Sequence, residues 1–297
     1  MSLHQYLNMP NLVESINKIL DKHGISETID LTNITITDKT VSDLVKENQK
    51  LSTLIVDAIW PSIDSLSVYH YTSKAAAESI INSGEFRLYS LLKRFDEGEI
   101  RSFCENHGLD GYLATDDSAE PKYKSLLMDN MFYASFTDTD IDQSVEEYFW
   151  NCFASSDGVR LKLKITASNP NFRKMIYEKT KGKPLPLLKD LTEKIRTSYN
   201  REFILTGISR LCAFYLYQEF DIENEYRALY RYWEGFGNPP KTDGTYQYVP
   251  LPLGKMSEAG YQVDIKEIPL VSDRIHSNFN WLPPGAPSSA RPASVSS

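Results

Sequence analysis

The 297-residue chain has only three cysteines, and no two of them have the C-x-x-C spacing of a redox or zinc-binding pair. An odd number of scattered thiols argues against a disulfide framework and against a zinc site, so Cys104, Cys152 and Cys212 are expected to be buried thiols. No apolar run approaches the roughly 20 residues that span a bilayer, and we expect no transmembrane helix. The first residues lack the basic and apolar segments of a secretory signal, which predicts synthesis in a cytoplasm.

The chain has fewer basic than acidic residues. The chain carries 40 acidic against 32 basic residues, a formal net charge of -8. Proteins that bind nucleic acid concentrate lysine and arginine, so this balance argues against a nucleic-acid partner and favours a protein or a small molecule. Apolar and aromatic residues are abundant, with 41% hydrophobic residues and 18 tyrosines. This content predicts a soluble globular protein with a large core, in one large domain or two modest ones.

The residue patterns divide the chain into three parts. Residues 1–63 are expected to form a helical region, with one helix after Asn11 and a second over 41–59. Residues 64–274 alternate strand and helix signals, which predicts an α+β domain with a mainly antiparallel sheet. Residues 283–297 are mainly Pro, Ala and Ser, and we expect this tail to be disordered.

Alternating apolar residues and turn residues locate the elements of the α+β domain. A helix is expected up to Gly84, another over 142–152, and a mainly helical stretch over 171–220. Residues 91–130 are charged and irregular, which predicts a long loop region. The expected strands are 66–71, 86–88, 131–137, 159–165, 224–232, 246–251 and 261–270.

Three of the strand-like segments, far apart in the chain, carry polar side chains at alternate positions. Alternate residues of a strand share one face, so each segment presents its polar side chains together. An ionised carboxylate stabilises positive charge that develops in a transition state, and a histidine and a hydroxyl position a ligand by hydrogen bonds. Two carboxylates on one face allow one to hold a donor while the other orients or deprotonates an acceptor. The pairs are His70 with Thr72, Tyr133 with Ser135, and Glu223 with Glu225.

Each of these residues also has a purely structural interpretation. A lone histidine on an aromatic strand is commonly a hydrogen-bonded core residue, and Tyr133 is an ordinary core former. A Glu-x-Glu pair is commonly the solvated face of a strand, and Arg227 is a simple ion-pair partner for Glu225. The functional interpretation therefore rests on the combination of the three segments and not on any single residue.

The surroundings of these segments resemble a bacterial family of domains of unknown function. The sequence Tyr69-His70-Tyr71-Thr72-Ser73, followed by a helix and by Phe86-Arg87-Leu88, is similar to the opening of that family, which begins L-Y-H-Y-T-S. Trp150-Asn151-Cys152-Phe153-Ala154 and Gly158-Val159 resemble its middle block, and Glu225-Tyr226-Arg227 resembles its E-W-R signature. The resemblance runs in order over about residues 66 to 271.

That family is similar in motif layout to the ADP-ribosyltransferases. The resemblance implies a split pair of small antiparallel sheets that clasp NAD, here with an added N-terminal helical region. His70-x-Thr72 resembles the subgroup with a His, Tyr, Glu triad, whereas Glu223-x-Glu225 resembles the arginine-modifying subgroup with an Arg, a Ser and a Glu-x-Glu pair. This mixture leaves the second motif position open between Tyr133 and Ser135.

The same resemblance implies roles for the motif residues. It implies that Glu225 is the catalytic residue, that Glu223 engages a guanidinium acceptor, and that no metal takes part. On this basis Glu225→Gln is expected to abolish transfer and to leave folding intact. NAD, as co-substrate, is expected to bind against His70, Tyr71, Thr72, Tyr133 and Ser135.

The implied function is that of a mono-ADP-ribosyltransferase, which uses NAD to modify a side chain, arginine first, of a target protein. We expect no nucleic-acid or membrane partner. Such a domain would suit a bacterial effector that is made in the bacterial cytoplasm and delivered into another cell. Two alternatives stay open: an NAD glycohydrolase, in which water replaces the acceptor side chain, and a non-catalytic NAD-binding or interaction module.

Overall fold

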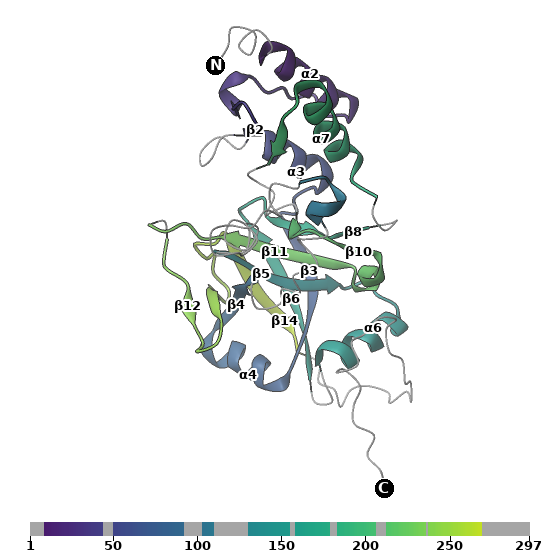
Figure 1. Cartoon of the computed structure of the whole chain (residues 1–297). Helices are drawn as coiled ribbons and strands as arrows, with labels where there is room; N and C mark the ends of the chain where they lie inside the picture. The colour runs from purple at the N-terminus through teal and green to yellow at the C-terminus, as the bar shows by residue number, and fades with distance from the viewer. Residues whose placement is uncertain are drawn as a thin grey trace.

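The computed structural model describes residues 9–43, 50–91, 103–109, 130–154, 158–178, 183–205, 212–235 and 237–268 (Figure 1). The fold is mixed α+β, which confirms the expected class. The loop region expected at 91–130 falls largely, and the Pro-Ala-Ser tail wholly, outside the described residues. None of the described helices is long and apolar enough to cross a membrane.

A nine-stranded antiparallel sheet forms the lower part of the molecule in Figure 1. Its main path runs through β12 (Lys241–Thr242), β13 (Gln247–Pro252), β4 (Glu85–Ser90), β5 (Met131–Asp138), β3 (Ser65–Thr72), β6 (Val159–Ala167) and β14 (Tyr261–Glu267). Strand β11 (Glu225–Arg231) pairs with β5 and with β7 (Phe172–Lys174). The sheet curls, because a bridge between Leu253 and Val263 brings β13 beside β14. The strands that were expected to form two small sheets form this one curled sheet, because β3 and β4 both pair with β5.

Local signals in the sequence account for the elements around β3. Strand β6 alternates buried aliphatic residues with more exposed polar ones, as a strand with one face on a core should. Ser73 caps helix α4 (Lys74–Ser83), because its hydroxyl accepts a hydrogen bond from the amide of Ala76 at 3.2 Å. Gly84 then ends the helix in the left-handed conformation, at φ 65°, which costs glycine no steric strain.

The N-terminal region is only partly helical. Helices α2 (Met9–Lys22) and α3 (Lys50–Ile59) are separated by a 3-10 helix, η1 (Leu31–Asn33), and by strands β1 (Ile34–Ile36) and β2 (Thr40–Asp43). The helix expected over 41–59 is therefore wrong in its first residues. There, β2 pairs antiparallel with β1 and parallel with β9 (Glu202–Ile204), so tertiary pairing outweighs the local helix pattern.

The mainly helical stretch expected over 171–220 is also wrong. It contains helix α7 (Pro186–Tyr199) and the 3-10 helix η6 (Gln218–Glu223), but its other described elements are strands. Two of them, β8 (Ile176–Glu178) and β10 (Tyr215–Tyr217), pair with each other in parallel. Strands of three residues are too short for apolar alternation to reveal, and only their distant partners define them.

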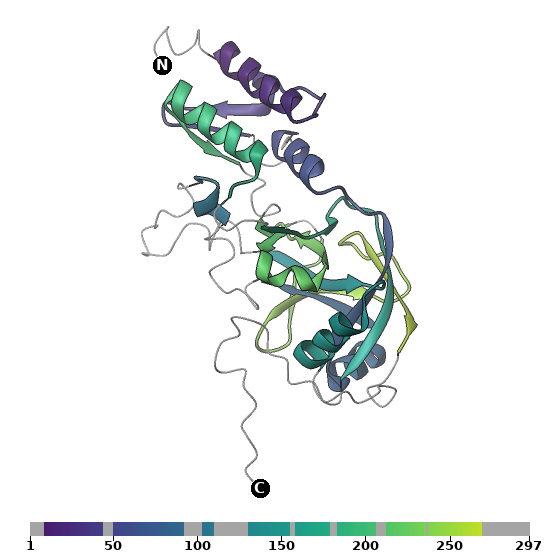
Figure 2. The ribbon, with the colours of Figure 1, turned by 90° about the vertical axis from the view of Figure 1, so that its right-hand side faces the viewer.

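The helical part shares its core with the sheet. Helices α2 and α7 pack against each other, and their buried residues belong to a cluster that includes Tyr133 of β5 and Leu229 of β11. A second cluster consists almost wholly of residues of the curled sheet. The N-terminal region expected at 1–63 is thus completed by α7 and β9 from later in the chain (Figure 2).

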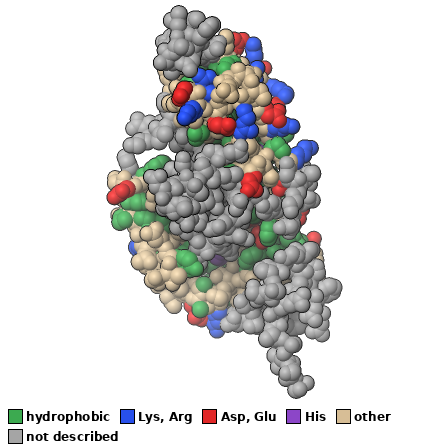
Figure 3. Space-filling view, in the orientation of Figure 1, with side chains coloured by type: hydrophobic (Ala, Val, Ile, Leu, Met, Phe, Trp, Pro, Cys, Tyr) green, Lys and Arg blue, Asp and Glu red, His purple; other side chains and the backbone are tan. Residues whose placement is uncertain are grey.

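Charged side chains on the face seen in Figure 3 gather over the N-terminal part, where basic and acidic residues are interspersed. Exposed ion pairs of the helical part include Lys18 with Glu14 at 2.6 Å and Lys22 with Asp190 at 2.7 Å. Exposed pairs of this kind contribute little to stability. The shared apolar core, and not these pairs, therefore holds α2 against α7.

One buried histidine makes the stability of this part depend on pH. His107 is buried, and its ring contacts the rings of Phe103 and Tyr215, with centroids 4.2 and 5.7 Å apart. The amide of Leu185 donates to its Nε2 at 2.9 Å, so the ring donates from Nδ1 to the carbonyl of Phe103 at 2.7 Å. Burial lowers the pKa of His107 from 6.5 to about 4. The ring stays neutral in the folded protein at pH values where the unfolded chain is protonated.

We expect the free energy of unfolding to fall as the pH drops from 6.5 towards 4, because the unfolded chain then binds a proton that the folded chain does not. At pH 4.5 the loss from this group is about 2–3 kcal/mol relative to pH 7, since one pKa unit corresponds to about 1.4 kcal/mol. Urea denaturation of the wild type and of His107→Gln at both pH values measures the effect. The variant should lose less on acidification, and equal losses would contradict the assignment.

Candidate functional site

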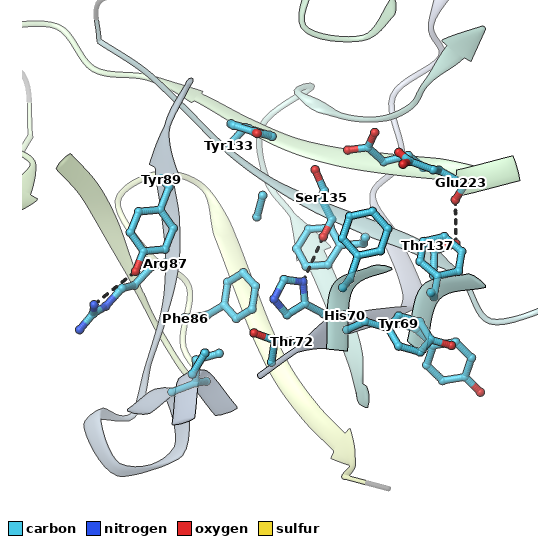
Figure 4. A pocket seen from close by; sticks show the side chains of 18 of the residues that line it. Tyr69, His70, Thr72, Phe86, Arg87, Tyr89, Tyr133, Ser135, Thr137 and Glu223 are labelled. Atoms are coloured by element: carbon cyan, nitrogen blue, oxygen red, sulfur yellow. Dashed lines mark hydrogen bonds between the residues drawn. The ribbon is translucent and has the colours of Figure 1, made fainter. Parts of the chain in front are cut away.

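A pocket of about 320 Å³ lies where strand β3 separates from β5 (Figure 4). The two strands pair only through Val68 with Asp138 and Tyr69 with Thr137. Strand β4 pairs with β5 further along, at Tyr133, and β11 pairs with β5 along its whole length. Between these contacts, at 134–136, no strand of the described ranges pairs with β5 on the side of β3 and β4. The pocket fills this gap, and its volume is in the range of small-molecule sites.

His70 lies at the gap, where its side chain contacts β5 in place of backbone hydrogen bonds between β3 and β5. Its Nδ1 donates to the carbonyl oxygen of Ser135 at 3.1 Å. The ring packs against Phe86 and Phe136, with centroids 5.1 and 5.9 Å apart. A histidine that is held by one nitrogen and by two aromatic rings has a fixed orientation. The half-buried imidazole lines the pocket, as the motif hypothesis requires.

The two residues after His70 also line the pocket, but in different ways. Thr72 lies beside His70 in Figure 4 and ends strand β3. Tyr71 is buried, and its ring stacks on Phe149 at 5.1 Å and meets Trp150 edge-on at 5.2 Å. Burial raises the pKa of Tyr71, so its hydroxyl stays protonated. Tyr71 therefore belongs to an aromatic wall of the pocket, and Thr72 shares the pocket with His70.

Both candidates for the second motif position line the pocket. Tyr133 is buried, and the guanidinium carbon of Arg227 lies 5.2 Å from the centre of its ring. The hydroxyl oxygen of Ser135 is buried and has no hydrogen-bond partner among the described residues. A buried polar group without a partner costs about 1–3 kcal/mol, so such a group at a pocket marks a place where a ligand or a water is bound.

Glu225 and Arg227 form a buried bidentate ion pair. The Nε of Arg227 donates to Oε1 of Glu225 at 2.7 Å and its Nη2 to Oε2 at 3.2 Å, and each side chain is 5% exposed. Arg227 also donates to the carbonyl of Ala213 at 2.8 Å. The amide of Glu225 donates to the hydroxyl of Tyr177, and burial together with the charge of Glu225 raises the pKa of that hydroxyl. Arg227 is thus the ion-pair partner of Glu225, as its simplest interpretation predicted.

Glu223 does not lie on one strand face with Glu225, contrary to the prediction. It ends the 3-10 helix η6, and Asn224 turns the chain with a φ of 40° before β11 begins. Asparagine tolerates this left-handed conformation better than most residues. The hydroxyl of Tyr148 donates to Oε1 of Glu223 at 3.2 Å, and that of Thr137 donates to its carbonyl at 2.9 Å. These contacts bring Glu223 to the same pocket as Glu225 by a different route.

The cysteines are buried as predicted at Cys104 and Cys212, but Cys152 is exposed. Cys152 belongs to a π-helix, η5 (Trp150–Ala154), which follows helix α6 (Gln143–Phe149). Partial burial of the thiol and the nearby carboxylate of Glu223 raise the pKa of Cys152. A raised pKa makes the reactive thiolate scarcer at neutral pH, so this exposed thiol is not an activated nucleophile.

Sequence reasoning missed two polar pocket residues on β4. Arg87 and Tyr89 line the pocket, and they alternate along the strand with buried Phe86 and Leu88. The alternation was visible in the sequence and placed Arg87 and Tyr89 on the face away from the core. It did not show that this face meets the pocket, because that follows from the pairing of β4 with β5.

The pocket therefore combines a fixed histidine, a buried serine hydroxyl, two carboxylates and an arginine. Such a set can hold a polar ligand by hydrogen bonds and can stabilise positive charge that develops beside the carboxylates. Over the described ranges, no group of three or more His, Cys, Asp or Glu side chains is placed to hold a metal ion.

Comparison with known proteins identifies no relative. No protein-family model matches the chain, and no curated protein and no solved structure matches it. The resemblance to ADP-ribosyltransferases therefore stays a prediction from the sequence motifs, and the pocket has to be interpreted from its own chemistry.

Proposed function

We propose that the chain is an NAD-dependent mono-ADP-ribosyltransferase that modifies a side chain of a target protein, with arginine as the first candidate. The observation that carries the proposal is that all seven motif residues line one pocket. They come from three segments that are distant in the chain, and the motif hypothesis requires them to meet. The residues are His70, Tyr71, Thr72, Tyr133, Ser135, Glu223 and Glu225.

In the proposed reaction, the bond between nicotinamide and ribose breaks and positive charge develops on the ribose. Nicotinamide leaves with the electron pair of that bond, and an acceptor nitrogen bonds to the ribose carbon and releases one proton to water. Arg227 orients the Glu225 carboxylate before reaction and occupies two of its roughly four acceptor sites. Because Arg227 also offsets part of the carboxylate charge, direct contact of Glu225 with the ribose must supply the stabilisation.

His70 and Ser135 act in this proposal as positioning residues for NAD. The imidazole is fixed by its bond to the Ser135 carbonyl, and the Ser135 hydroxyl is buried at the pocket with no partner among the described residues. A ligand hydroxyl or amide at this place would pair it and remove the cost of burying it unpaired. This favours Ser135 over Tyr133 as the hydroxyl that binds NAD, because the Tyr133 ring already packs under Arg227.

The proposal is tested with the pure protein, NAD labelled in its adenylate half, and a lysate of eukaryotic cells, because the sequence predicts an effector that enters another cell. A transferase labels one or more proteins in the lysate and releases an equal amount of nicotinamide. Nicotinamide release without labelled protein would indicate an NAD glycohydrolase instead. Neither labelling nor release would contradict both enzyme proposals and favour a non-catalytic module.

Glu223→Gln is expected to lower protein labelling about tenfold or more and to change NAD hydrolysis by less than about twofold. A guanidinium acceptor binds a carboxylate through charge-assisted hydrogen bonds, whereas water needs no such partner. Both activities are measured on one preparation. Glu267→Gln is the matched control, because it removes an exposed carboxylate, paired with Lys162, that does not line the pocket. Equal losses in the two activities would show that Glu223 serves NAD binding or the fold.

A further inference from the structure

Arg87 is a cation that lines the pocket and is held by aromatic residues. Its Nη1 is 3.4 Å from the hydroxyl of Tyr89, and its guanidinium carbon lies 4.3 Å from the ring centre of Tyr248. The rings of Tyr89 and Tyr248 are themselves in contact, at 5.9 Å between centroids. Among the described residues, Arg87 forms no ion pair with a carboxylate. Its guanidinium is thus fixed in place while its charge is not neutralised by a direct partner.

The charges of the pocket are separated. In Figure 4, Arg87 and Tyr89 lie on one side, Glu223 lies on the opposite side, and His70 lies between them. The second carboxylate, Glu225, belongs to the segment that follows Glu223. A pocket with a cation on one side and carboxylates on the other complements a ligand that is anionic at one end and cationic at the other.

We infer that Arg87 is a positioning residue that binds the diphosphate of NAD. The inference rests on the proposed function and adds the orientation of the co-substrate. NAD carries a negative diphosphate and a positive nicotinamide ring, joined by a ribose, so the diphosphate would lie at Arg87 and the nicotinamide ribose at the carboxylates. Guanidinium groups bind phosphate oxygens in bidentate fashion, and a guanidinium that is already stacked loses less freedom when it does so.

The experiment measures binding by calorimetry for four ligands: NAD, ADP-ribose, inorganic pyrophosphate and nicotinamide riboside, which has no phosphate. Arg87→Gln is expected to lower the affinity for NAD and for ADP-ribose about 10- to 100-fold, because hydrogen bonds to a charged group are lost. The affinity for nicotinamide riboside should change by less than about twofold. Lys174→Gln is the matched control, because it removes another cation that rests on a tyrosine ring, Tyr226, outside the pocket.

The outcomes separate this inference from the proposed function. Unchanged affinity of Arg87→Gln for ADP-ribose, or equal losses for all ligands, would overturn the role of Arg87 even if NAD is turned over. Pyrophosphate that binds as tightly as ADP-ribose would overturn it as well, because the site would then hold a free anion and not a dinucleotide. If Arg87→Gln loses affinity only for the ligands that contain a diphosphate, the inference is supported. If the wild type binds NAD in this way but does not turn it over, the inference stands and the proposed function fails.

A second variant covers the case in which Arg87→Gln does not fold. Arg87→Lys keeps the charge and the contact with Tyr248 but loses the planar fork. Its affinity for ADP-ribose is expected to lie between those of the wild type and Arg87→Gln, with a thermal transition like that of the wild type. An affinity equal to that of the wild type would overturn the bidentate contact.

Discussion

Glu225→Gln is expected to lower the free energy of unfolding by about 3–5 kcal/mol, because it leaves the buried charge of Arg227 without a partner. This replaces the prediction from the sequence that folding would stay intact, because Glu225 belongs to a buried ion pair in the structure. Urea denaturation followed by circular dichroism measures the loss. A variant with the stability of the wild type would show that water or another group reaches Arg227 once Glu225 is neutral.

Two further variants complete a double-mutant cycle for this pair. Arg227→Met leaves Glu225 unpaired and should also lose about 3–5 kcal/mol. The double variant Glu225→Gln/Arg227→Met removes both charges, and it is expected to be more stable than either single variant by about 2 kcal/mol or more. Losses that simply add would mean that the two side chains do not interact, which the bidentate geometry at 2.7 and 3.2 Å argues against.

Turnover is expected to separate from stability in the same set of variants. If Glu225 stabilises the developing charge on the ribose, the double variant recovers its fold but still releases nicotinamide about 10²–10³-fold more slowly than the wild type. The single-turnover rate of nicotinamide release, measured where circular dichroism shows each variant folded, gives the comparison. A neutral amide keeps the shape of the side chain and removes the charge.

Turnover of the stable double variant also tests the catalytic role of Glu225. Recovery of turnover together with stability would mean that Glu225 serves only to neutralise Arg227, and another group would have to carry the chemistry. Arg227→Met is the complementary variant, because it keeps the Glu225 carboxylate and removes the guanidinium that orients that carboxylate. It is expected to retain more turnover than the double variant, once both are compared in the folded state.

The elements around the site were predictable where the signal is local. Strand signals in the sequence predicted β6, β13 and β14 to within a few residues, and Gly84 ends α4 where the sequence predicted a stop. The failures lie at 41–43 and in 171–220, where strands of three or four residues form by pairing with distant segments, β2 with β9 and β8 with β10. Local periodicity carries no information about such partners.

The candidate site was predictable in its residues but not in its geometry. His70, Ser135, Glu223 and Glu225 were chosen because polar side chains recur at alternate positions of strands, and all line one pocket. The turn at Asn224, which separates the two carboxylates, was not predicted. Neither was Arg87, because a charged residue that alternates with core residues on a strand is ordinary until the strand's neighbour is known.

The sequence by itself determined the longer strands of the curled sheet and the end of helix α4 at Gly84, because these depend on interactions over a few residues. The tertiary structure decided that β3 and β4 leave a gap along β5, that Glu225 is held by Arg227, and that Arg87 lies across the pocket from the carboxylates. A gap between strands depends on where each strand stops pairing with its neighbours. That is a balance among contacts of residues far apart in the chain, and no spacing within one segment encodes it.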